Sequence, residues 1–192
     1  RGQLLNPFAK RFKTTLHIAE ARGHVQGFAV LMHDPVVKFC YLDYIASAGS
    51  LSARGIGGAL YQVVREESLI LGSYGLFFEC LPDNTEKAST IELAQQNKAR
   101  LRFYEHYGAY PIINTDYERP LEPGDLDMPH LMFDDLDAGK PLRRLVAKKV
   151  IRAILERKYA NLCPPEYVEA VVSSVKADPV ELRASRYVKT PV

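Results

Sequence analysis

The chain lacks the features that mark several classes of protein. It contains no run of about 18 consecutive apolar residues, so we expect no membrane-spanning helix. No basic stretch followed by an apolar stretch opens the sequence, so we expect no secretory signal and predict a cytoplasmic location. The first residue is Arg1 rather than Met, and we interpret the chain as a piece of a longer protein with further domains.

Cysteine and histidine are scarce and scattered. The three cysteines form no CxxC pair, and we expect Cys40 and Cys80 in buried strands and Cys163 in a loop. The five histidines show no spacing that suits a metal ion, so we predict no metal site. These histidines are His17, His24, His33, His106 and His130.

The charge of the chain is nearly balanced but unevenly spread. Of 192 residues 47% are hydrophobic and 25% are charged, which indicates one globular domain, alone or with a small appendage. Segment 116–137 carries eight acids and one base, whereas segment 140–158 carries eight bases and one acid. The basic segment alone would suggest nucleic acid, but its acidic neighbour can neutralise it. We therefore do not expect nucleic-acid binding.

Hydrophobic periodicity predicts alternating strands and helices. Alternating and β-branched patterns predict strands at 14–21, 25–32, 39–47, 76–81, 110–114 and 129–133. Helical spacing predicts helices at 57–71, from the end of the 82–90 loop to about 107, at 141–159, and from Pro165 onward. Residues 178–192 have the composition of a tail or linker. This order predicts an α/β fold, a mixed sheet followed by a helical extension.

The segment Tyr41–Leu60 carries the strongest chemical signal. Gly55, Gly57 and Gly58 gather at a helix start, where glycine is costly unless the backbone must come close to something. A helix start offers unpaired N–H groups and the positive end of the helix dipole, which suit a phosphate. A tight turn with close packing would also explain the glycines. The segment matches neither GxxxxGK[ST] nor GxGxxG.

Two separate motifs resemble the GNAT acetyltransferase family. YLDYIAS followed by RGIGGAL resembles the family's central strand and its R/Q-x-x-G-x-G/A coenzyme A signature, filled by Arg54, Gly57 and Ala59. NKARLRFYEHYGAYPI resembles the later segment that supplies an asparagine and a tyrosine, filled by Asn97 and Tyr104. The resemblance implies a GNAT-like, mostly antiparallel twisted sheet flanked by helices over 1–138, with 139–192 as a helical extension or linker.

The resemblance also implies how acetyl-CoA would bind as cosubstrate. The backbone of the helix start would hold the pyrophosphate, and the end of the central strand would bind the pantetheine arm and the thioester. Asn97 would contact the coenzyme near the pantetheine. The backbone positions are Ile45, Ala46 and Ser47 on the strand and Gly55, Ile56, Gly57, Gly58 and Ala59 on the helix.

The expected reaction is attack of a primary amine on the thioester. Such an amine is nearly all protonated at pH 7, so it needs a base. Glu79 and Asp43 are the two candidates, because burial in an apolar strand would raise the pKa of a carboxyl group. Structural roles would equally explain both carboxylates. By resemblance, Tyr104 is the general acid for the leaving thiolate, and packing against the sheet is its alternative role.

The acidic segment 116–127 suggests a cationic acceptor such as a polyamine, a lysine or an aminoglycoside. A solvated loop would also explain these acids. Two other functions remain open for the whole chain. A non-catalytic acyl-CoA-binding module of a larger protein would bind the coenzyme without turnover. An interaction domain that docks a partner through the basic helix would not bind the coenzyme at all.

Overall fold

The computed structural model of the protein describes residues 11–47, 55–84 and 86–188. The chain divides into two compact units, of which the first ends at Phe78 and the second begins at Glu79. Each unit has its own strands, helices and buried side chains. The sequence-based boundary between 1–138 and 139–192 stays a prediction.

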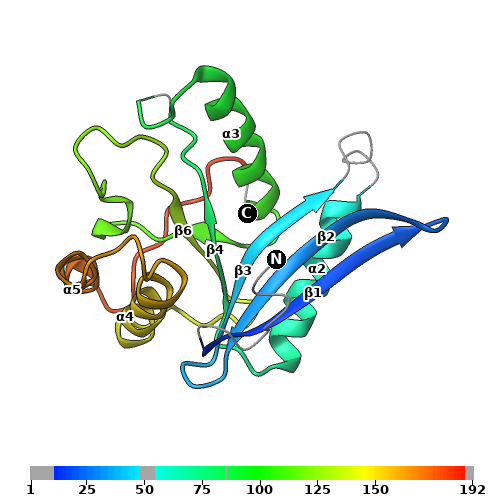
Figure 1. Ribbon diagram of the computed structural model, residues 1–192, viewed down its shortest axis with the longest axis horizontal. Coiled ribbons are helices and arrows are strands. Elements are labelled where there is room, and N and C mark those ends of the chain that lie inside the picture. Colours follow the sequence, from blue (N-terminus) through cyan, green and yellow to red (C-terminus); the bar gives the residue numbers. More distant parts are fainter. Residues whose placement is uncertain (1–10, 48–54, 85, 189–192) are drawn as a thin grey trace. The chain divides into compact units, whose positions relative to one another are not determined.

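The first unit is an antiparallel meander that continues into a parallel strand (Figure 1). Strands β1 (Lys13–Ala21), β2 (His24–Asp34) and β3 (Phe39–Ser47) pair in succession, each antiparallel to the next. The first three residues of β4 (Leu76–Cys80) belong to this unit and pair parallel with β3. All four strands lie within two residues of their predicted bounds.

Aromatic side chains fill the core of the first unit. Phe39 packs edge-to-face on Phe12 and on Phe77, with ring centroids 6.0 and 5.8 Å apart. Tyr61 packs in the same way on Phe78, at 5.8 Å. All five side chains are buried, so the aromatic-rich strands predicted from the sequence do face a core.

Helix α2 (Ile56–Ile70) covers β2 and β3 with one face. Leu60, Tyr61 and Val64 are buried along that face, at helical spacing. Gly72, with φ +66°, follows the helix, and its N–H donates to the carbonyl of Leu69. The N–H of the next residue donates to the carbonyl of Ser68, which completes a Schellman C-cap. The predicted glycine stop is confirmed.

The second unit contains helix α3 (Ile91–Glu105) and a short strand pair. The hydroxyl of Thr90 accepts from the N–H of Leu93, a side-chain N-cap that starts α3. Strand β5 (Tyr110–Pro111) pairs antiparallel with β6 (His130–Asp134). The prediction of a strand over 110–114 was too long, because the N–H of Ile113 donates to Glu181 instead.

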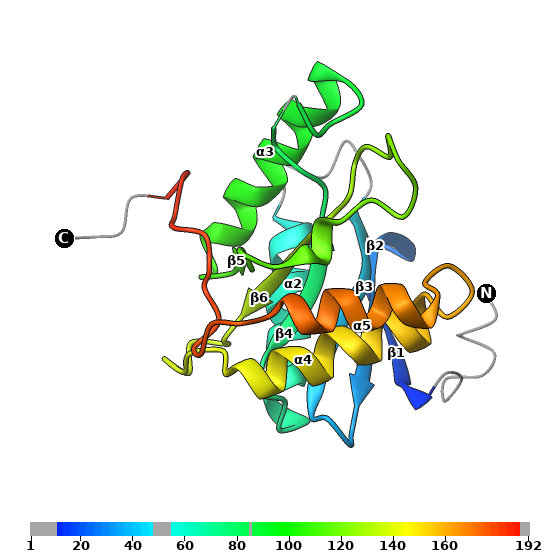
Figure 2. The ribbon, with the colours of Figure 1, turned by 90° about the vertical axis from the view of Figure 1, so that its left-hand side faces the viewer.

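Two C-terminal helices lie side by side in the second unit (Figure 2). Helix α5 (Pro165–Ser174) begins at the predicted proline. Helix α4 (Arg144–Ala153) starts later than predicted, because Arg143 has an extended backbone with ψ 140°. Its last turn is the π-helix η4 (Ile154–Lys158) rather than a continued α-helix.

The segment after α5 is not the free tail that its composition suggested. The carboxylate of Glu105, 2% exposed, accepts from the hydroxyl of Ser185 and from the N–H groups of Arg186 and Tyr187, at 2.8–3.1 Å. A buried carboxylate requires such partners, and the C-terminal segment supplies them. The segment is therefore part of the second unit's packed structure as far as residue 188.

The predicted fold class is confirmed by the strand pairings inside the two units. Three of these pairings are antiparallel and one is parallel, so the strands form a mixed and mostly antiparallel arrangement. Helices pack on these strands in both units, as α2 does on β2 and α3 does on β5. The helical extension at the end of the chain is also present.

Candidate functional site

A β-bulge interrupts β3 shortly before its carboxyl end. Leu42 and Tyr44 face successive residues of β2, so Asp43 between them is the extra residue of the bulge. Bulges redirect side chains and are common next to active sites. The side chain of Asp43 is half-buried.

The end of β3 extends beyond its parallel partner. The pairing of β3 with β4 ends at Leu42, whereas β3 continues to Ser47. Ile45, Ala46 and Ser47, the three residues predicted to bind the pantetheine arm, therefore pair on the β2 side. All three are half-buried. Backbone groups along such an overhang are placed to bond to a ligand.

The start of α2 is an uncapped helix N-terminus. Gly55 stands at the N-cap with φ 76°, a left-handed conformation that favours glycine. The first backbone bond of the helix runs from the N–H of Ala59 to the carbonyl of Gly55, at 2.9 Å. The helix has no side-chain cap and no acidic residue in its first turn. Its first N–H groups, of Ile56, Gly57 and Gly58, are therefore oriented to bind an anion.

The space beside Gly57 helps to decide between the two explanations of the glycines, a phosphate cradle and a tight turn with close packing. A Cβ added at Gly57 would meet no atom within 4 Å, so close packing does not require glycine there. An anion that approaches the helix start would use that open space. The helix start therefore fits the phosphate cradle predicted from the sequence. Arg54, the other side chain predicted at this cradle, lies outside the described residues.

Gly27 on β2 holds the helix start against the end of β3. A Cβ at Gly27 would lie 2.7 Å from the carbonyl oxygen of Ala46 and 3.2 Å from Cγ2 of Ile56. Any larger residue would push β2 and β3 apart, because real Cβ atoms essentially never come within 3.0 Å of another heavy atom, and the contact with Ile56 would also be tight. Gly27 thus brings together two parts of the predicted coenzyme site within the first unit.

Glu79 lies in the second unit at the centre of a hydrogen-bonded cluster. The phenol of Tyr117 donates to its Oε1 at 2.6 Å, and the phenol of Tyr159 donates to its Oε2 at 2.5 Å. The ammonium of Lys158 lies 3.0 Å from the same Oε2, with 13% of the Glu79 side chain exposed. The carboxylate of Glu79 is therefore satisfied by two phenols and one ammonium group. It is not the lone carboxyl group in an apolar strand that the sequence suggested.

Burial and the charge of Glu79 keep the neighbouring phenols protonated. Desolvation, followed by repulsion from Glu79, raises the pKa of Tyr159 to about 12. The same two causes, in the same order, raise the pKa of Tyr117 well above its ordinary value. Both phenols therefore stay protonated and act as hydrogen-bond donors to Glu79.

Tyr104 is buried on α3, with 9% of its surface exposed. Its ring packs edge-to-face on Phe103, with centroids 5.1 Å apart. Desolvation raises the pKa of Tyr104, so the phenol keeps its proton at ordinary pH. A proton donor needs this protonation state. The catalytic role of Tyr104 stays a prediction.

Asn97 is completely buried on α3. Its amide N–H donates to the carbonyl oxygen of Pro82 at 3.0 Å, and its amide oxygen accepts from Arg100 at 3.3 Å. The bond to Pro82 ties the chain just after β4 to α3, which is a structural role. Contact of Asn97 with the coenzyme stays a prediction.

The part of the chain that the structure describes gives no sign of a metal site or a membrane-spanning helix. Within 11–47, 55–84 and 86–188, no three metal-binding side chains gather. No helix in these same ranges is long and apolar enough to cross a membrane. Cys40 and Cys80 are buried, as predicted, and desolvation raises the pKa of Cys80 to about 12. That thiol is therefore neutral and unreactive.

Bases of the basic segment pair with acids outside the acidic segment. Arg143 pairs with Asp178 at 3.2 Å, and Arg152 pairs with Glu169 at 2.5 Å. Lys158 pairs with Glu79. Neutralisation of the basic helix therefore comes at least partly from α5 and the following segment, rather than only from the 116–137 segment as expected.

No protein-family model and no curated protein matches the chain. Solved structures with a similar fold are acetyltransferases. A nourseothricin acetyltransferase has a TM-score of 0.46 and 17% identity, over 62% of this chain and 62% of its own. A GNAT family acetyltransferase from Elizabethkingia anophelis with acetyl-CoA bound has a TM-score of 0.45 and 19% identity, over 62% and 74%.

An aminoglycoside 6′-N-acetyltransferase complexed with coenzyme A has a TM-score of 0.48 and 14% identity, over 69% of this chain and 74% of its own. The structural neighbours are thus GNAT acetyltransferases of low sequence identity. The chain spans less than two thirds of the nourseothricin acetyltransferase. Likenesses at this distance concern the fold and carry no argument about activity.

The sequence did not reveal two parts of this arrangement. Gly27 gave no signal beyond being a glycine within a predicted strand, a pattern that indicates close approach of another backbone. The partners of Glu79 gave none, because Tyr117, Lys158 and Tyr159 lie far from it in sequence and belong to segments that looked like a loop and a basic helix.

Proposed function

We propose that the protein is an acetyl-CoA-dependent N-acetyltransferase, which moves the acetyl group to a primary amine by direct attack in a ternary complex. One observation carries the proposal. Among the described residues, no side chain caps the start of α2 and no acid lies in its first turn; Gly57 leaves open space there, and Gly27 fixes the helix start against the end of β3. Unpaired N–H groups at a helix start are the usual donors for a phosphate group.

Residues of the chain would carry out the two proton transfers that the reaction needs. Acetyl-CoA would supply the thioester and the leaving thiolate. A primary amine has a pKa of about 10.4, so a base must take its proton before attack. Glu79 and Asp43 remain the two candidates for that base. Tyr104, whose raised pKa keeps its phenol protonated, would give a proton to the thiolate.

The acceptor belongs to the proposal as well. Acids of the 116–127 segment would attract a cationic amine. Glu118 of the short helix η3 (Asp116–Glu118) is already paired with Lys87, at 2.8 Å, so the acids further along the segment are the ones that would do so. A cytoplasmic location is part of the same proposal.

Calorimetric titration with acetyl-CoA tests the proposed site. Wild-type protein should bind acetyl-CoA, and Gly57→Glu should abolish binding because its carboxylate would occupy the phosphate position. The open space at Gly57 allows that variant to fold. Ile70→Glu is the matched control, since Ile70 is 83% exposed at the far end of the same helix. Absence of wild-type binding at millimolar coenzyme would refute the proposal.

A further inference from the structure

A small cavity opens in the second unit beside Glu79. Its volume is about 130 Å³, and its lining is mostly apolar, from Leu121, Met128, Leu155 and Leu162 among others. Glu79, with its donors Tyr117 and Tyr159, lines the same cavity. The cavity therefore combines an apolar wall with one charged group, as ligand sites commonly do.

An ammonium group of the chain itself already occupies the charged end. Nζ of Lys158 lies 3.0 Å from Oε2 of Glu79 and 2.8 Å from the phenol oxygen of Tyr159. The same Nζ lies 4.6 Å from the centroid of the Tyr159 ring. A carboxylate, a phenol oxygen and an aromatic face are together a receptor for an ammonium ion. Lys158 comes from the end of the π-helix η4, a distortion common at functional sites.

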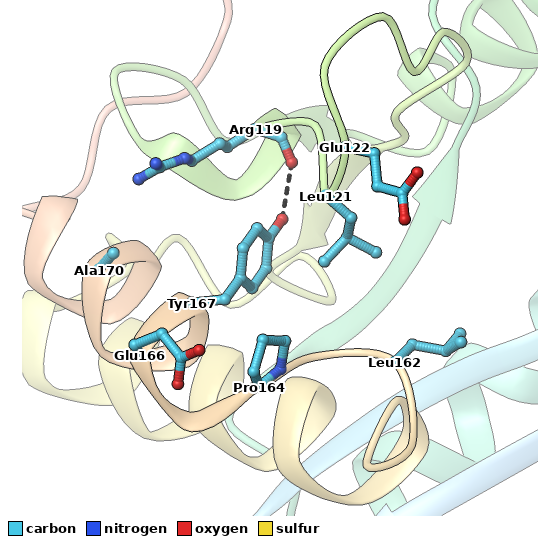
Figure 3. A pocket seen from close by; sticks show the side chains of 8 residues that line it. All are labelled: Arg119, Leu121, Glu122, Leu162, Pro164, Glu166, Tyr167 and Ala170. Atoms are coloured by element: carbon cyan, nitrogen blue, oxygen red, sulfur yellow. Dashed lines mark hydrogen bonds between the residues drawn. The ribbon is translucent and has the colours of Figure 1, made fainter.

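Figure 3 shows a second hollow, whose lining includes the side chains of Glu122 and Glu166 as well as Arg119. The two hollows share Leu121, Leu162 and Tyr167. Tyr167 spans the second hollow from α5 and donates to the carbonyl oxygen of Arg119 at 2.7 Å (Figure 3).

The second hollow also has exposed apolar and acidic side chains. Two carboxylates, of Glu122 and Glu166, and one guanidinium, of Arg119, line it, which leaves a net charge of about one negative. Leu121 and Leu162 are 40% and 63% exposed, so apolar surface continues from the second hollow to the cavity. The second hollow would attract a cation and repel an anion.

We propose that this cavity is the acceptor site, and that it binds a primary amine carried on an apolar, aliphatic or aromatic body. The ligand's ammonium takes the place of Lys158 Nζ at Glu79, and its body lies along the leucines. Lys158 is then an internal competitor, which neutralises Glu79 until the amine arrives. The role of the bound amine as acetyl acceptor rests on the proposed function, whereas binding of the amine itself requires no coenzyme.

The test is binding of 2-phenylethylamine, measured by calorimetry without acetyl-CoA, with 2-phenylethanol as its uncharged analogue. The wild type should bind the amine and not the alcohol. Lys158→Met removes the competitor, so it should bind the amine about fivefold more tightly, the range of a partly exposed ion pair. Glu79→Gln should bind it at least about tenfold more weakly, since it loses the ammonium's counter-charge.

Lys149→Met is the matched control, because Lys149 is an exposed lysine of α4, and its amine affinity should equal that of the wild type. Equal binding of the amine and the alcohol, or no gain in Lys158→Met, would overturn the inference. Acetyl-CoA titration of the wild type keeps the two proposals apart. If the coenzyme binds but the variants do not differ in amine affinity, only the acceptor-site proposal is refuted. If the amine affinities change as expected but the coenzyme does not bind, only the transferase proposal is refuted.

Discussion

A Cβ on Gly27 would lie 2.7 Å from the carbonyl oxygen of Ala46. Gly27→Ala must therefore shift β2, β3 or the start of α2. We expect it to lower the free energy of unfolding by about 1–3 kcal/mol, as overpacking of a tight contact does. Acetyl-CoA affinity should fall too, because the helix start moves. Urea unfolding and calorimetry measure the two effects, and an unchanged protein would show that the elements adjust freely.

Gly57→Ala should behave in the opposite way. A Cβ there meets no atom within 4 Å, and alanine is better in a helix than glycine by up to about 1 kcal/mol. Stability in urea should stay equal or rise slightly. Acetyl-CoA affinity should fall, because the methyl group occupies the space through which a phosphate would approach. A variant that binds the coenzyme as well as the wild type would argue against this cradle.

The role of Tyr104 separates an enzyme from a coenzyme-binding module. Tyr104→Phe keeps the ring that packs on Phe103 but removes the proton donor. With an amine acceptor in hand, kcat should fall by about 10²–10⁴, the usual contribution of a general acid. The dissociation constant of acetyl-CoA should not change. Equal kcat in both proteins would remove Tyr104 from the acid role.

Local chemistry made most of the elements predictable. Alternating and aromatic patterns placed β3 at its observed bounds. Glycine at a left-handed C′ position ended α2 after Leu71, because only glycine adopts that backbone cheaply. The sequence shows such a requirement directly when it comes from the local backbone, as at Gly72, but not when it comes from a distant contact, as at Gly27.

Partners distant in sequence could not be predicted. Glu79 was singled out as a carboxylate in an apolar strand, but its bonds to Tyr117, Lys158 and Tyr159 depend on how the later segments pack. The tail prediction failed for the same reason, since Ser185 and Tyr187 looked polar and unpatterned until Glu105 was seen to bind them. Composition describes a segment alone, whereas a buried charge determines what must cover it.

Glu105→Ala tests how firmly the C-terminal segment is held. The change leaves the partly buried N–H groups of Arg186 and Tyr187 without their acceptor. Unfolding in urea should show a loss of about 1–3 kcal/mol, the cost of donors that lose their partner. Glu169→Ala is the control, because the side chain of Glu169, which pairs with Arg152, is 61% exposed and an exposed ion pair contributes little to stability. Equal losses would mean that the segment contributes little.

His130 makes the stability of the second unit depend on pH. Its Nδ1 donates to Oε1 of Glu118 at 2.5 Å, and its Nε2 lies 3.9 Å from Oδ1 of Asp83. Desolvation lowers the pKa of His130, but the nearby carboxylates of Asp83 and Glu118 outweigh it and raise the pKa above its ordinary value, against a smaller opposing effect of Arg183. The folded protein therefore holds this proton more tightly than the unfolded chain does.

A raised folded pKa gives stability that is complete below the unfolded value of about 6.5 and lost as the pH rises through the folded value. Wild-type protein should thus unfold at a lower urea concentration at pH 9 than at pH 6. His130→Gln should lose most of that difference, while the same change at the exposed His106 should keep it. If His130→Gln retained the full difference, the proton on His130 would not be its source. Because Asp83 also binds Arg183 and Tyr187, losing that proton should loosen the C-terminal segment first, which hydrogen exchange at residues 182–188 would detect.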